Sequence, residues 1–135
     1  MDLVDVLRAR RRIAPYVRRT PLVASDWLSD AAHARVSLKL ESLQVSSSFK
    51  SRGAFNAVMA RLERGGDRPL RLVTASAGNH GRALAAAAEI FRLPLVVFTP
   101  ADAPRSKVAA ITRHDAELIR GSADPGREQE IVKYG

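Results

Sequence analysis

From residue 36 onward the chain alternates between short apolar segments and longer amphipathic ones, and this alternation restricts the folds open to it. The apolar segments have the length of strands and the amphipathic ones the length of helices. We expect strands over 36–41, 70–74, 93–99 and 116–119, and helices over 49–62, 79–91, 104–114 and 125–134. Strands that alternate with helices predict a parallel sheet with helical crossovers, and therefore an α/β fold.

The segment before residue 36 has a different pattern. A helix is expected over 2–13, where apolar residues recur at helical spacing, and an extended piece over 20–23 around a proline. Ser25 and Asp26 can cap a short helix that ends near residue 32.

Composition excludes several classes of protein. The 135 residues include no cysteine, which excludes disulfide scaffolds and thiolate sites, and the three histidines share no metal-ligand spacing. There is no apolar run long enough for a membrane span and no signal-like N-terminus, so we expect a cytoplasmic protein without a metal or membrane contact. The net charge is +8, but the arginines are scattered and aromatic residues are few. We expect no specific nucleic-acid binding, with a basic nucleic-acid-binding module as a distant alternative.

Two turns carry the candidate chemistry. Lys50 begins an expected helix, where the positive helix end disfavours a second cation. Such a lysine either reaches into solvent or is a nucleophilic amine. The turn at 76–80 can offer backbone N–H groups to an anion, or can be an ordinary serine-capped turn. His80 is equally compatible with a structural and an active role.

The two turns resemble motifs of the threonine dehydratase family, which are pyridoxal-phosphate enzymes of the tryptophan-synthase-β fold group. SFKSRGA occupies 48–54 and SAGNH occupies 76–80, while RRTPL at 18–22 and LKLE at 38–41 match in place. The resemblance covers nearly the whole chain. It implies a three-layer αβα fold with a mainly parallel sheet, the incomplete form of the pyridoxal-phosphate type II fold. Residues 1–49 would belong to the larger domain, whose remainder is absent, and 50–135 to the smaller one.

The resemblance also assigns roles within the two turns. Lys50 would form the covalent link to pyridoxal 5'-phosphate and later move the α-proton of the substrate. Phe49 would pack beside the cofactor ring, and Asn79 would hydrogen-bond its 3-oxygen. The loop expected to hold the substrate carboxylate, mostly through backbone N–H groups, consists of Ser76, Ala77, Gly78 and His80.

Three features depart from the family pattern. Ser47 replaces a glycine before SFK, which strains the turn if its φ is positive. Arg82 stands where a glutamine is common. Members of the family are also much longer, and their glycine-rich phosphate loop and the residue facing the pyridine nitrogen lie in the missing part. Nothing in residues 123–135 resembles such a loop.

The resemblance implies β-elimination of water from L-threonine, L-serine or a similar 3-hydroxy amino acid, giving a 2-oxo acid and ammonia. Alternatives are a truncated, inactive fragment of such an enzyme, a dehydratase for another hydroxy amino acid such as one from hydroxyectoine breakdown, and a serine racemase. A racemase needs a second acid, and Ala77 has no transferable proton. The complete enzyme is expected to be a homo-oligomer that acts on a small amino acid.

Overall fold

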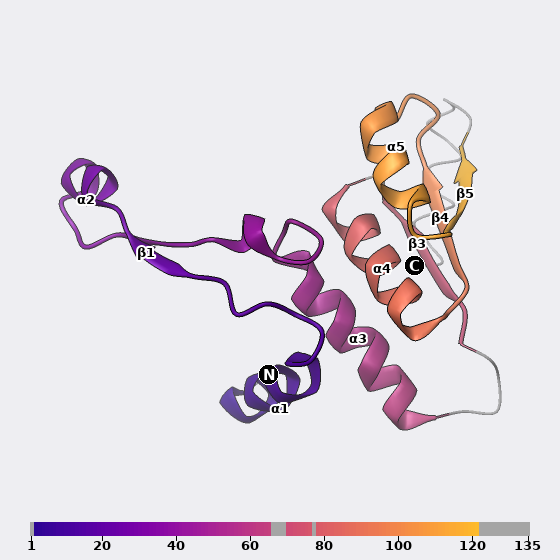
Figure 1. Ribbon diagram of the computed structural model, residues 1–135, viewed down its shortest axis with the longest axis horizontal. Coiled ribbons are helices and arrows are strands. Elements are labelled where there is room, and N and C mark those ends of the chain that lie inside the picture. The colour runs from indigo at the N-terminus through magenta and orange to yellow at the C-terminus, as the bar shows by residue number, and fades with distance from the viewer. Residues whose placement is uncertain (1, 66–69, 77, 122–135) are drawn as a thin grey trace.

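One long helix connects the two parts of the molecule. The structure is a computed structural model that describes residues 2–65, 70–76 and 78–121. In Figure 1, α3 (Lys50–Arg64) lies in the middle, with a sheet and two helices on one side and an extended N-terminal arm on the other. The first of the two turns that the sequence singles out therefore lies where the arm enters α3, and the second lies beyond α3 at the start of α4.

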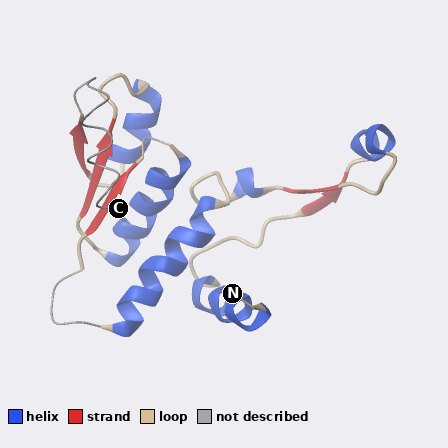
Figure 2. Ribbon diagram, turned by 180° about the vertical axis from the view of Figure 1, so that it is seen from behind, coloured by secondary structure: helices blue, strands red, loops and turns tan. Residues whose placement is uncertain are grey.

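A parallel sheet forms the part that follows α3. Its strands lie in the order β3-β4-β5, with Leu72 paired to Leu95 and Val97 paired to Leu118. The connecting helices α4 and α5 lie on the same face of the sheet (Figure 2), which confirms an α/β fold with a parallel sheet. The helix expected over 125–134 lies outside the described residues. The elements are β3 (Leu72–Ala75), α4 (Asn79–Phe91), β4 (Leu95–Thr99), α5 (Arg105–Thr112) and β5 (Glu117–Arg120).

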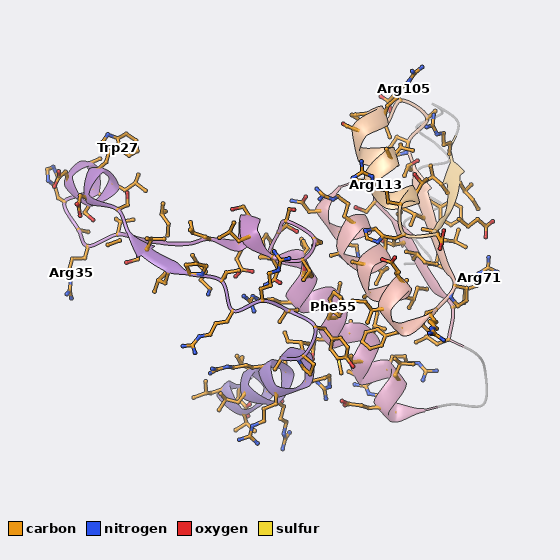
Figure 3. The ribbon with its side chains drawn as sticks, viewed as in Figure 1. Trp27, Arg35, Phe55, Arg71, Arg105 and Arg113 are labelled. Atoms are coloured by element: carbon orange, nitrogen blue, oxygen red, sulfur yellow. The ribbon has the colours of Figure 1, made fainter. Side chains whose placement is uncertain are left out.

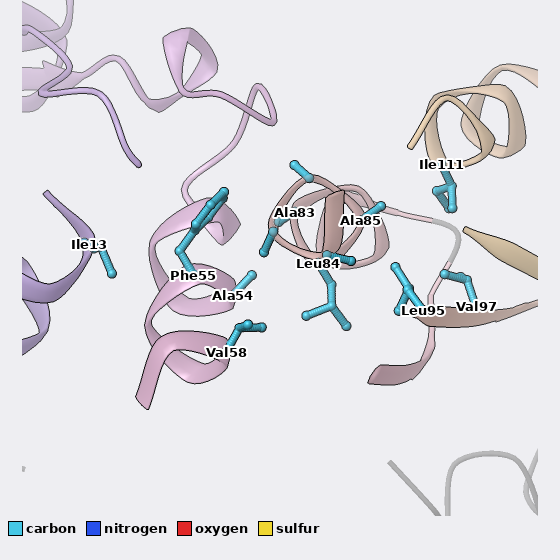
Figure 4. Close-up of a cluster of buried hydrophobic side chains, with 13 residues drawn as sticks. Ile13, Ala54, Phe55, Val58, Ala83, Leu84, Ala85, Leu95, Val97 and Ile111 are labelled. Atoms are coloured by element: carbon cyan, nitrogen blue, oxygen red, sulfur yellow. The ribbon is translucent and has the colours of Figure 1, made fainter. Parts of the chain in front are cut away.

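The core lies between the sheet, α4 and α3 (Figure 4). Most buried positions of α4 are alanines, and small side chains allow the helix to pack closely against both neighbours. From α3, Phe55 is fully buried, and its ring centroid lies 6.0 Å from those of Tyr16 and Phe91. Phe55 therefore joins α3 to α4 and to the segment that follows the first helix of the arm.

The N-terminal arm corrects one expectation. The strand expected over 36–41 is β2, and it pairs antiparallel with β1, as in Val23 with Leu38, instead of joining the parallel sheet. Alternation of apolar and polar residues indicates a strand but not its partner, and the short helix between β1 and β2 lets the chain turn back on itself. The arm consists of α1 (Leu3–Ile13), β1 (Leu22–Ala24), α2 (Asp26–Ala32), β2 (Ser37–Lys39) and a 3₁₀ turn (Glu41–Leu43).

The surface of the arm is rich in exposed apolar side chains. Trp27 lies at its far end (Figure 3) and is 77% exposed, and Leu22 and Leu38 are exposed on the two strands. Arginines project from both parts of the molecule, including Arg35 on the arm and Arg105 at the start of α5. None of the helices in the described ranges is long and apolar enough to cross a bilayer. Those ranges also contain no cluster of potential metal ligands.

Candidate functional site

Lys50 is the first residue of α3, as the sequence predicts within one residue. Its side chain is exposed, and its Nζ lies 5.2 Å from the centroid of the Phe49 ring. Phe49 precedes the helix and provides no capping hydrogen bond. Within the described ranges no carboxylate forms an ion pair with Lys50. The amine therefore lies unpaired at the positive end of a helix.

A cleft of about 530 Å³ opens beside Lys50, between α3, β3 and α4. Its basic lining residues are Lys50, Arg61 and His80, and no carboxylate lines it within the described part of the chain. The remaining lining residues are Phe49, Gly53, Ala54, Ala57, Val58, Leu72, Val73 and Leu84. A mostly apolar cleft with basic groups in its lining suits an anionic ligand with an apolar body.

The second turn is built around the Ser76 side chain. Its hydroxyl accepts hydrogen bonds from the backbone N–H groups of Gly78 at 3.2 Å and Gly81 at 3.3 Å. A Cβ on Gly81 would lie 2.2 Å from the carbonyl oxygen of Ser76. Only glycine permits this approach, so Gly81 is a site residue that the sequence reasoning missed. The available signal was a glycine in the first turn of a helix, directly after SAGNH.

The structure brings together some of the expected site residues and separates others. Phe49, Lys50 and His80 line the same cleft, although they come from two different helices. Asn79 is the exposed first residue of α4 and is not among the lining residues, and Gly78 caps that helix. Ala77 lies outside the described residues. The contacts of Ser76 match the serine-capped turn that the sequence left open, and its role toward an anion stays a prediction.

Ser47 has a φ of +56°, so the condition under which serine strains this turn is met. We expect Ser47→Gly to stabilise the protein by about 1 kcal/mol, because glycine adopts this conformation without a Cβ clash. Thermal melting should show a rise of roughly 4 °C. Ser48→Gly, at a neighbour without positive φ, is the control and should give no gain. An equal rise in both variants would show that strain at Ser47 is not the cause.

The space beside Gly53 on α3 shows whether pyridoxal phosphate can fit this cleft. Gly53 follows Lys50 by about one turn, and a Cβ there would meet no atom within 4 Å. A glycine inside a helix costs about 1 kcal/mol relative to alanine, and no neighbour in the described structure requires one. Gly53 therefore leaves space for a flat ring beside an amine that can react with its aldehyde. The residues present fit the ring and aldehyde of this cofactor.

Comparisons with known proteins identify the family of the chain. Residues 13–134 match the family described as pyridoxal-phosphate dependent enzyme. L-threo-3-hydroxyaspartate ammonia-lyase of Pseudomonas sp is 38% identical over 115 residues, which are 85% of this chain and 35% of that protein. Serine racemase of Arabidopsis thaliana is 35% identical over 135 residues, which are 97% of this chain and 39% of that protein.

A solved structure shows the same fold. The serine racemase of maize superposes with a TM-score of 0.82 at 33% identity, over 98% of this chain and 40% of that one. This chain thus spans well under half the length of the relatives it matches. The match over nearly all of the chain shows that it belongs to the family of pyridoxal-phosphate dependent enzymes, whose cofactor is pyridoxal 5'-phosphate.

Proposed function

We propose that this chain forms the lysine-bearing part of an enzyme that eliminates water from L-threonine, L-serine or a similar 3-hydroxy amino acid. The observation that carries the proposal is the apolar cleft that Lys50 and His80 both line, where Lys50 forms no ion pair with a carboxylate of the described residues. Lyases and racemases of amino acids are among the relatives. Membership of the family therefore does not fix the reaction type or the substrate, and both are part of the proposal.

The roles follow from the chemistry of each group. The cofactor, when bound, supplies an electron sink for charge that develops at the substrate α-carbon. Lys50 Nζ removes the α-proton, and the β-hydroxyl leaves so that water is lost overall. Hydrolysis of the resulting enamine gives a 2-oxo acid and ammonia. Phe49 would pack beside the cofactor ring, and Asn79 would donate a hydrogen bond to its 3-oxygen. Ser76, Ala77, Gly78 and His80 would hold the substrate carboxylate.

The same proposal assigns the N-terminal arm to a different domain from the parallel sheet. Residues 1–49 would belong to a larger domain and residues 50–135 to a smaller one, since the arm leads away from the parallel sheet (Figure 1). Exposed Leu22, Trp27 and Leu38 support this assignment, because apolar side chains of an arm are normally covered by further protein.

Ala77 distinguishes elimination from racemisation. A racemase must deliver a proton to the face of the α-carbon opposite Lys50, and a methyl side chain cannot do so. General acids contribute about 10²–10⁴ in rate. In a protein that carries this chain with the remaining length of the family, we expect L-serine to give pyruvate and ammonia with little D-serine.

An assay of 2-oxo acid together with chiral chromatography of the same reaction measures both products. Ala77→Ser is the matched variant and should raise the share of D-serine, because it adds a hydroxyl at this position. D-serine that forms as fast as pyruvate in the unmodified protein would favour racemisation. Absence of both products with L-serine and L-threonine would contradict the proposed reaction.

A further inference from the structure

A partly buried carboxylate binds the first turn of α3 through two hydrogen bonds. Arg52 follows Lys50 by two residues on this turn, and its Nε and Nη2 donate to Glu41 Oε2 and Oε1 at 3.0 and 2.7 Å. The Glu41 side chain is only 16% exposed. A two-point contact between a guanidinium and a carboxylate fixes orientation as well as distance.

The same carboxylate binds the segment that precedes β1. Thr20 Oγ1 donates to Glu41 Oε1 at 2.5 Å, and Lys39 Nζ donates to the carbonyl oxygen of Thr20, also at 2.5 Å. The hydrogen bond from Arg52 lowers the pKa of Glu41, which keeps this carboxylate ionised at neutral pH. We call Glu41, Arg52 and Thr20 the Glu41 clamp, since these three side chains join the arm to α3.

Ser51 also ties the start of α3, because its fully buried hydroxyl accepts from the N–H of Ser46 at 3.2 Å and forms a hydrogen bond with the Ser46 hydroxyl at 2.5 Å. This tie joins the first turn to the segment just before the helix, whereas the Glu41 clamp joins the turn to the arm.

Phe49 gives the helix no side-chain cap, and Ser47 holds a strained conformation just before it. Uncapped helix ends tend to fray. Gln44 adds a second tie, because its side chain accepts from the N–H of Arg18 at 2.8 Å and donates to the carbonyl of Arg18 at 2.9 Å. This tie reaches the turn before the helix but not the turn that carries Lys50.

We propose that the Glu41 clamp is a positioning device that directs Lys50 into the cleft. Lys50 and Arg52 share one helical turn, so the contact that orients Arg52 also sets the direction in which that turn presents Lys50. The inference rests on the proposed role of Lys50 in binding the cofactor. It assigns Glu41, Arg52 and Thr20 a role that acts through Lys50 and involves no contact with the reacting atoms.

Site-resolved trapping on the 135-residue chain tests this proposal. The protein is treated briefly with pyridoxal phosphate and then with borohydride, and peptide mass spectrometry gives the share of label on Lys50 relative to all other lysines. We expect Glu41→Gln to lower that share about tenfold, the fold-change that corresponds to about 1.4 kcal/mol. Arg52→Gln should act in the same direction, because glutamine cannot make the two-point contact and adds no competing amine. Glu41→Asp, which keeps the charge, should recover part of the share.

Glu63→Gln is the matched control. Glu63 accepts from Arg12 at 2.8 Å and lies on the same helix, but at the end far from Lys50. Its loss should lower the melting temperature without changing the Lys50 share. If Glu41→Gln and Arg52→Gln also leave the share unchanged, the clamp is only structural and the proposal is wrong. If Glu41→Gln does not fold, Arg52→Gln and Glu41→Asp decide the question. If the label in the unmodified chain is not concentrated on Lys50, the proposed function is wrong. The clamp proposal, which rests on it, is then wrong as well.

Discussion

Gly81→Ala is expected to destabilise the protein by about 3 kcal/mol or more, the upper part of the range for overpacking a tight site. The new Cβ would lie 2.2 Å from the carbonyl oxygen of Ser76 and 3.3 Å from Cδ1 of Ile111. The first of these atoms belongs to the backbone, so relief requires the turn and α4 to move apart. That movement would also break the hydrogen bond from Gly81 N–H to the Ser76 hydroxyl. Thermal and denaturant unfolding measure the loss.

Gly53→Ala is the control for this substitution. Gly53 also lies in a helix, but its Cβ would meet no atom within 4 Å. Alanine has the higher helix propensity, so the unfolding free energy should rise by up to about 1 kcal/mol. Similar losses in the two variants would show that the close approach at Ser76 does not constrain Gly81.

Phe55→Ala should cost about 3–5 kcal/mol, the usual range for removing a buried aromatic ring. Phe55 is fully buried and contacts Tyr16 and Phe91, so its loss leaves a cavity where three segments of the chain meet. We expect denaturant unfolding to begin at much lower concentrations or to lose its cooperativity. Phe49→Ala is the control beside the same helix, since Phe49 is 60% exposed. A similar loss in Phe49→Ala would contradict the placement of the core.

The bounds of helices that are set by neighbouring residues were predicted from the sequence to within a few residues. The helix expected over 79–91 has the same bounds as α4, because its start at a glycine-bearing turn and its periodicity lie within the segment itself. The cap at Ser25 was predicted for the same reason, since a serine side chain bonds a backbone N–H only three residues away. The partner of β2 was not predicted, because pairing with β1 depends on how the chain returns after α2.

In the candidate site, too, features with a local sequence signal were predicted, and features that depend on the fold were not. The helix-start position of Lys50 follows from neighbouring residues and is confirmed. The strain at Ser47 was expected only on the condition of a positive φ, and the structure meets that condition. The clamp was not predicted, although Glu41 and Arg52 lie in two of the matched motifs. Contact between them depends on the fold that brings the arm to α3. Gly81 was missed because its constraint comes from the carbonyl of Ser76 across the turn, which no periodicity reveals.

The most direct test of the proposed site is to identify the lysine that binds pyridoxal phosphate. Treating the 135-residue chain with the cofactor, reducing it with borohydride and mapping the peptides gives the answer without any substrate. We predict that label concentrates on Lys50, because among the lysines in the described part of the chain this amine begins a helix beside the SAGNH turn, and that Lys50→Ala removes it. Label on Lys39, Lys107 or Lys133 with Lys50 unmodified would contradict the assignment.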